Sequence, residues 1–244
     1  MLGRKLGSLF AAFVLFAAAS FAVSAAPRER TAKASAETAR VESPLNLAIL
    51  IQDDLVSRVG TELNVTRDFI RSLPAGSRVM VAYVTAGSLQ VRQPFTTDLE
   101  KAAKSLRMPV GSTNASPYNP YVEVVEALKR FESGGTNRNA LLFISDGLDT
   151  SRGFDTDSAG NTIDLQRAVK EAQKRSVSVY SFYAPTVGLT SFSRLAVSYG
   201  QSSLNRLSNE TGGRAFFQGT SYVTFDSYFD RLRTALNEQY PKAY

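Results

Sequence analysis

A short apolar run that ends abruptly in an acid and a glycine most constrains how this chain can fold. Ala140–Ile144 is almost wholly apolar, as expected of a strand whose two faces are both buried in a parallel sheet. Ser145-Asp146-Gly147 follows it directly. Because open α/β sheets place their ligand sites at the carboxyl ends of strands, this run predicts a parallel sheet that presents Asp146 at its edge.

Similar apolar runs alternate with amphipathic segments along the chain. Strands are predicted at Asn46–Gln52, Arg78–Thr85, Leu89–Phe95, Ala140–Ile144, Val177–Tyr183 and Arg214–Phe217. Helices are predicted at Ser57–Ser72, Thr97–Leu106, Tyr121–Phe131, Asp164–Arg175, Ser203–Thr211 and Tyr222–Tyr240. The short turn Ala86-Gly87 suits an antiparallel pair, and Pro94 suits an edge strand. We therefore expect a doubly wound α/β domain, with a mostly parallel sheet of about six strands, one antiparallel edge strand, and helices on both faces.

The first residues predict an export signal. Arg4 and Lys5 precede an uncharged apolar run, Leu9–Val23, and the small residues that follow suit cleavage. Residues 1–26 are expected to be a signal peptide, 27–44 a disordered linker and 45–244 the folded domain. An uncleaved N-terminal anchor is the alternative, because the run is near the lower limit of a membrane span. The mature chain is expected to be exported, periplasmic or extracellular, and to contain no membrane span.

Composition excludes several classes of function. The 244 residues include no cysteine and no histidine, which excludes disulfides, thiol catalysis, zinc–thiolate sites and histidine-based triads. The net charge of +6 comes from scattered basic residues, without the basic stripe and interleaved aromatic residues typical of nucleic-acid binding. No phosphate-binding loop or dinucleotide fingerprint is present. We therefore expect neither an enzyme nor a nucleic-acid-binding protein.

Three polar loops are expected to meet at the carboxyl edge of the predicted sheet. Asp53–Ser57 follows the first strand, Gly111–Asn114 precedes the helix that begins near Tyr121, and Ser145–Gly147 follows the central strand. Their carboxylate and hydroxyl oxygens are the ligands that hard divalent cations prefer.

The chain from Leu45 onward resembles the von Willebrand factor A domain. The resemblance is carried by the order of elements and by the stretches NLAILIQDD, FTTDLEKAAKSL, LLFISDGLDT and LNRLSNETGGRAFF. The last two stretches resemble exported bacterial members in particular. The resemblance implies a cation site built from an Asp-x-Ser-x-Ser motif, a threonine from a middle loop and a final aspartate.

Carried over by position, this implied cation site falls on Asp53, Ser57, Thr113 and Asp146, with Ser112 as a second match for the threonine. Leu55 stands where the first serine ligand would be, and a leucine has no lone pair to offer. A site for Mg²⁺ or Ca²⁺ is therefore predicted to be degenerate at Leu55. Asp54 is expected to point to the other side if the backbone stays extended, and the alternative is that it swings into the site from a loop. The alternative is that Asp53 and Asp146 cap helices and hold no metal.

Two further segments have competing interpretations. Asp155–Asn161 resembles a calcium loop, but Ala159 and Gln166 stand at ligand positions, which favours a solvated turn. Thr186–Tyr199 carries Leu189, Phe192 and Leu195 at helical spacing, which favours packing on the domain over a partner-binding surface.

The resemblance implies a non-catalytic, exported interaction domain that binds an unknown protein partner. A divalent cation in the site would accept an acidic group of that partner. The alternative is a metal-free scaffold domain whose vestigial cation site is not used, and which binds partners through other surfaces.

Overall fold

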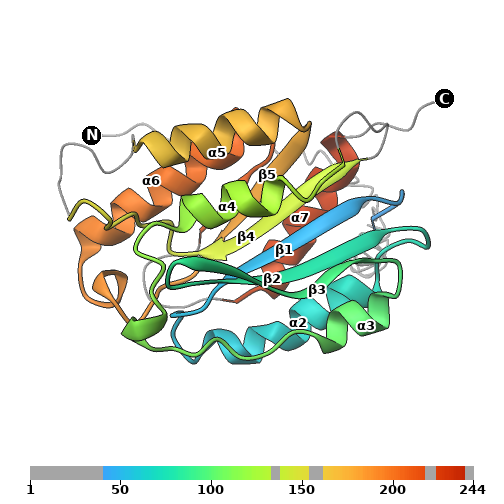
Figure 1. Ribbon diagram of the computed structural model, residues 1–244. Helices are drawn as coiled ribbons and strands as arrows, with labels where there is room; N and C mark the ends of the chain where they lie inside the picture. Colours follow the sequence, from blue (N-terminus) through green and yellow to red (C-terminus); the bar gives the residue numbers. More distant parts are fainter. Residues whose placement is uncertain (1–40, 133–137, 154–161, 218–223, 240–244) are drawn as a thin grey trace, which may run out of the picture. The chain divides into compact units, whose positions relative to one another are not determined.

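The computed structural model describes residues 41–132, 138–153, 162–217 and 224–239 (Figure 1). Its six-stranded sheet has the order β3-β2-β1-β4-β5-β6. The strands are β1 (Asn46–Gln52), β2 (Arg78–Thr85), β3 (Ser88–Thr96), β4 (Asn139–Ser145), β5 (Val177–Tyr183) and β6 (Ala215–Phe216). Only β3, at one edge, runs antiparallel to its neighbour; the other pairs are parallel. The predicted fold class is confirmed.

Helices cover both faces of the sheet (Figure 1). One face carries α2 (Val59–Arg71), α3 (Leu99–Lys104) and α7 (Asp226–Gln239). The other carries α4 (Pro120–Leu128), α5 (Ile163–Lys174) and α6 (Arg194–Glu210). Two short 3-10 helices, η2 (Thr113–Ala115) and η3 (Leu189–Ser191), lie between the larger elements.

The central strands are apolar throughout because each faces a helical layer on both sides. In β1, Ile49 and Ile51 pack toward α2 and α7, whereas Ala48 and Leu50 pack toward α4 and α5, as period-two alternation requires. On the α7 side, the fully buried ring of Phe182 contacts four other rings, those of Phe216, Phe225, Tyr228 and Phe229.

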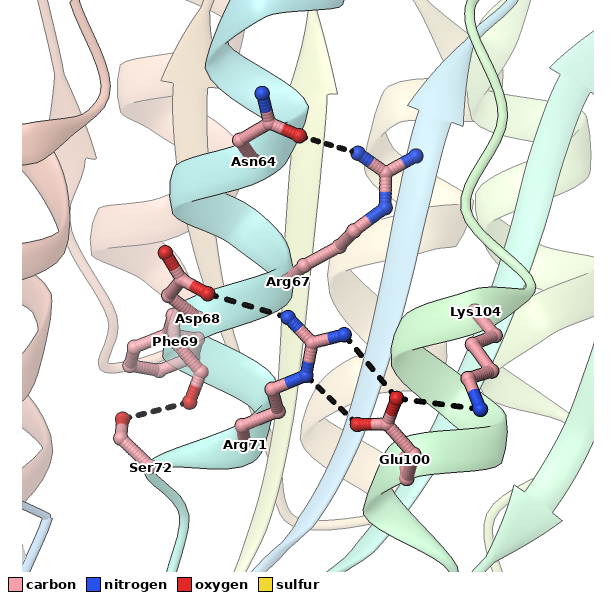
Figure 2. A network of polar contacts seen from close by, with 8 residues as sticks. All are labelled: Asn64, Arg67, Asp68, Phe69, Arg71, Ser72, Glu100 and Lys104. Carbon is pink, nitrogen blue, oxygen red and sulfur yellow. Dashed lines mark hydrogen bonds and ion pairs between the residues drawn. The ribbon is translucent and has the colours of Figure 1, made fainter.

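Polar contacts on the surface fasten α3 to α2 (Figure 2). Arg71 donates to both carboxylate oxygens of Glu100, at 2.7 and 3.2 Å. One turn earlier on α2, the Arg67 guanidinium donates to the carbonyl oxygen of Leu106 at 2.9 Å. These contacts hold the start of the segment that returns from α3 to the carboxyl edge of the sheet.

Two expectations about element bounds are corrected. Helix α6 begins at Arg194, nine residues before the predicted Ser203, because Ser193 caps it by accepting a hydrogen bond from the Ala196 amide at 3.2 Å. The folded domain also begins before Leu45, since Val41 is only 5% exposed and Ser43 accepts a hydrogen bond from Arg138 at 2.7 Å.

The predicted signal peptide, residues 27–40 of the predicted linker and the whole of Asp155–Asn161 lie outside the described residues. Among the helices that are described, none combines the length and apolar character needed to cross a membrane.

Candidate binding pocket at the carboxyl edge of the sheet

A pocket of about 260 Å³ opens at the carboxyl edge of the sheet, where the predicted loops were expected to meet. We call it the edge pocket. It lies between the ends of β1, β4 and β5 and the segment that leads into α4. It is lined by Gln52, Asp54, Thr113, Ser116, Tyr118, Asp146, Leu148, Thr150, Thr186, Gly188 and Leu189.

Asp146 lies deep in the edge pocket and is only 4% exposed. One carboxylate oxygen accepts from the Leu148 amide at 3.1 Å, and the other accepts from the hydroxyls of Thr186 and Thr190 at 2.9 and 3.0 Å. Burial raises the pKa of Asp146, and these hydrogen bonds to its charged form oppose that effect. The hydrogen bonds fix the carboxylate within the pocket wall and come from the loops after β4 and β5.

Close packing of α6 against the end of β4 fixes the backbone at Asp146. Gly147 has a φ of 71°, in the left-handed region that glycine adopts without strain. Gly200, inside α6, lies so near that a Cβ there would be 2.0 Å from the Asp146 carbonyl oxygen. Both glycines therefore allow the helix to approach the strand end, and Gly200 was not singled out from the sequence.

Asp54 faces Asp146 across the pocket and is 2% exposed. Gln52 connects the two walls: its amide donates to Asp54 at 2.8 Å, and its side-chain oxygen accepts from the Ser145 hydroxyl. Burial, and then the charge of Asp146, raise the pKa of Asp54 from 3.8 to about 6. Two carboxyl groups thus share one pocket whose lining residues include no lysine or arginine.

Asp53 has a different environment. Its carboxylate receives a bidentate ion pair from Arg107, at 2.6 and 2.8 Å, and a hydrogen bond from the Val110 amide at 3.0 Å. The Arg107 guanidinium also lies 4.0 Å from the ring centroid of Tyr83. An arginine side chain therefore provides the positive charge beside Asp53.

The structure brings together only part of the predicted cation site. Thr113 and Asp146 line the edge pocket, whereas Asp53 pairs with Arg107 and Ser57 is exposed outside the pocket lining. Leu55 is fully buried in the apolar core, so its position does not open a gap in the pocket wall. The degeneracy of a cation site at Leu55 stays a prediction. Asp54 lies in a turn and lines the pocket, which is the outcome expected where the backbone does not stay extended.

The turn after β1 explains this outcome. The strand ends at Gln52, and Asp53 and Asp54 form a turn in which Asp54 joins Gln52 in the pocket lining, while Asp53 and Leu55 lie outside it. Neither Asp53 nor Asp146 caps a helix, because the amides that they accept from, at Val110 and Leu148, lie in loops. Within the described ranges, no group of three or more acidic side chains is placed to share a metal ion.

Several functional residues were missed from the sequence. Gln52 carried a usable signal, the period of two along β1, and Asp54 belonged to a loop already expected at this edge. Arg107, Thr186 and Thr190 carried none, because only the folding of distant segments brings them to the two strand ends.

No family model matches the chain, and no curated protein sequence matches it. Several solved structures do match its fold. BatB from Bacteroides thetaiotaomicron is 13% identical, with a TM-score of 0.54 over 80% of this chain and 98% of that one. An aerotolerance-related membrane protein from Bacteroides fragilis, carrying multiple mutations to serine, is 14% identical, with a TM-score of 0.52 over 80% of this chain and 99% of that one. The VWA domain of SpRpn10 is 13% identical over 82% of this chain, but its TM-score of 0.44 is too low to define a fold by itself.

At these identities the likeness concerns the fold alone. The observed sheet order, with its single antiparallel edge strand and its two helical layers, is the arrangement expected from the sequence resemblance. The described domain has a von Willebrand factor A-like fold.

Proposed function

We propose that this chain is a non-catalytic interaction domain that binds a protein partner over the edge pocket. The observation that carries the proposal is the distribution of exposed apolar side chains. All the large hydrophobic side chains that are exposed in the described residues belong to loops at the carboxyl edge or to the first turns of helices that begin there. They are Met108, Val110, Tyr118, Val122, Ile163, Phe192 and Leu195, and we call them the apolar rim.

Gathered apolar side chains on a soluble surface favour an interaction site. Phe192 is 76% exposed and Leu195 46%, so two apolar side chains of the segment expected to pack on the domain instead point outward, whereas Val197 is buried. The alternative interpretation of Thr186–Tyr199, as a partner-binding surface beside the pocket, is therefore the one that we adopt.

Partner capture with surface variants tests the proposal. The double variant Phe192→Ser/Leu195→Ser should keep its melting temperature, because both side chains are exposed, and should lose partner binding at least tenfold. Arg130→Ser/Glu132→Ser, exposed after α4 and away from the carboxyl edge, is the matched control and should bind as the wild type does. Equal binding by both double variants would instead support the alternative, a scaffold that binds through other surfaces.

A divalent cation in the edge pocket stays a prediction. Of the predicted set, Thr113 and Asp146 line the edge pocket, whereas Asp53 pairs with Arg107 and Ser57 lies outside the pocket lining. Asp54 and Asp146, with the Thr113 hydroxyl, are the pocket oxygens that would hold Mg²⁺ or Ca²⁺ and present it to an acidic group. A ligand that binds only the native state must raise the melting temperature. An unchanged melting temperature with Mg²⁺, Ca²⁺ or EDTA would exclude this mode of binding.

We also propose that the chain is exported. The proposal rests on Arg4, Lys5 and the apolar run Leu9–Val23 in the sequence. The intact mass of the chain isolated from its cells tests it. A mass that corresponds to residues 27–244 supports cleavage, and the full mass supports the retained anchor.

A further inference from the structure

The charge inside the edge pocket has no counterpart in its own walls. Asp54 and Asp146 are both almost fully buried and line the same space, and no lysine or arginine is among the lining residues. Arg107 does pair with an acid after β1, but that acid is Asp53, which lies outside the pocket lining. Buried charges are normally paired, so a pocket of this kind favours a positive ligand.

The hydrogen bonds around the two acids leave capacity for such a ligand. Asp54 accepts hydrogen bonds from the side chains of Gln52 and Ser116, and the hydroxyl of Thr113 lines the same space. Carboxylates and hydroxyls are acceptors for an ammonium or guanidinium group.

The remaining walls suit an aliphatic stem. Leu148 and Leu189 line the pocket, and Tyr118 stands at its mouth with 62% of its surface exposed. Lysine and arginine pack their methylene stems against apolar surface while the charged head reaches a polar site. The pocket volume of about 260 Å³ is below the range of roughly 300–1,000 Å³ typical of small-molecule sites, which favours a single side chain.

We infer that the edge pocket receives a lysine or arginine side chain of the protein partner, with its positive head group between Asp54 and Asp146 and the flanking apolar residues of the partner on the apolar rim. The inference rests on the proposed function and names the chemistry of the partner at that site. It reverses the charge expected from the family resemblance, in which a metal ion would accept an acid. The physical reason is that this pocket has two acids and that Arg107 has already neutralised the third.

Three blocked peptides test the inference: acetyl-Leu-Lys-Phe-amide, its norleucine analogue and its glutamate analogue. Each is titrated into the full chain and followed by the amide NMR signals of Leu148 and Gly188, in the pocket wall. The lysine peptide should bind at least tenfold more tightly than the norleucine peptide, and the glutamate peptide should not bind. Addition of salt should weaken the binding of the lysine peptide only.

Variants identify the groups responsible. Asp54→Asn and Asp146→Asn should each weaken the binding of the lysine peptide at least tenfold without changing the affinity for the norleucine peptide. Asp149→Asn, which removes the same charge on the same loop but outside the pocket lining, is the matched control and should change neither.

The outcomes separate this inference from the proposed function. Equal binding of the lysine and norleucine peptides, or binding of neither, would overturn the inference, whereas the proposed function would still be decided by partner capture with Phe192→Ser/Leu195→Ser. Binding of the glutamate peptide only when Mg²⁺ or Ca²⁺ is present would overturn it in favour of the metal-mediated mode.

Discussion

Asp53 and Asp54 are neighbours in the sequence, are equally buried, and lie in opposite electrostatic environments. Asp53 is held by the Arg107 guanidinium and a backbone amide, so its charge is compensated within the protein. Asp54 instead faces a second carboxyl group, Asp146, and receives only neutral donors. The comparison shows that one step along the turn after β1 separates an acid that is ion-paired within the protein from an acid that lines the edge pocket.

Removal of the guanidinium beside Asp53 should have the largest effect. Arg107→Met would leave a buried carboxylate without its partner and should lower the free energy of unfolding by about 3 kcal/mol, as measured by urea denaturation at pH 7. The cause is the desolvated charge that remains, since methionine preserves most of the stem. Arg71→Met, which removes an arginine from the exposed ion pair with Glu100, is the control and should change stability little.

A double variant shows whether the remaining charge is the cause. Arg107→Met/Asp53→Asn removes both charges and should recover part of the stability lost in Arg107→Met. Equal destabilisation in the single and double variants would mean that packing against Tyr83, and not the charge of Asp53, explains the loss.

Substitution of Asp54 should raise the free energy of unfolding, and the size of this effect should depend on pH. The folded protein holds the proton of Asp54 more tightly than the unfolded chain does, so this group stabilises the fold at low pH. That stability is lost as the pH rises from the ordinary pKa of 3.8 through the folded pKa of about 6. Asp54→Asn should therefore be more stable than the wild type at pH 7, by at most about 3 kcal/mol, and similar to it near pH 4.

Urea denaturation from pH 4 to pH 7 measures this difference, and Asp149→Asn serves as the control with the same change of charge. A wild type that is equally or more stable than Asp54→Asn at pH 7 would show that the charge of Asp54 is compensated within the protein. The comparison between Asp53 and Asp54 would then fail.

The smallest expected effect is on the titration of Asp54 itself. The charge of Asp146 contributes to the raised pKa of Asp54, after burial, so Asp146→Asn should move that pKa downward without returning it to its ordinary value. Carboxyl ¹³C NMR over pH 3 to 8 measures the shift, with Asp149→Asn as the control. An unchanged titration midpoint would place the two carboxyl groups too far apart to share a ligand.

Most of the fold followed from local sequence patterns. The bounds of β1, β2 and β5 were predicted to the residue, because buried parallel strands read as unbroken apolar runs that turn residues terminate. The start of α6 was predicted wrongly, at Ser203, although Phe192 and Leu195 stand at helical spacing ahead of it. In the structure Ser193 caps the helix between them, and both side chains are exposed.

The candidate site followed from the sequence only in part. The sequence predicted that Asp146, Thr113 and the end of β1 meet at one edge, because the carboxyl ends of parallel strands share that edge. Which of the two acids, Asp53 or Asp54, enters the pocket depended on the turn that follows Gln52. The pairing of the loop after β5 with residues 54–56 settles this: the Val187 amide donates to the Asp54 carbonyl at 2.9 Å.

The sequence by itself determined the layered α/β fold and the edge at which a ligand would bind, because both depend on local periodicity and on the direction of parallel strands. Only the tertiary structure decided the charge of that site. Arg107 lies far from Asp53 along the chain and reaches it through the return of the chain from α3. Long-range pairing of this kind leaves no local pattern, and it converts one of the three acids at this edge into a structural ion pair while two remain open in the edge pocket.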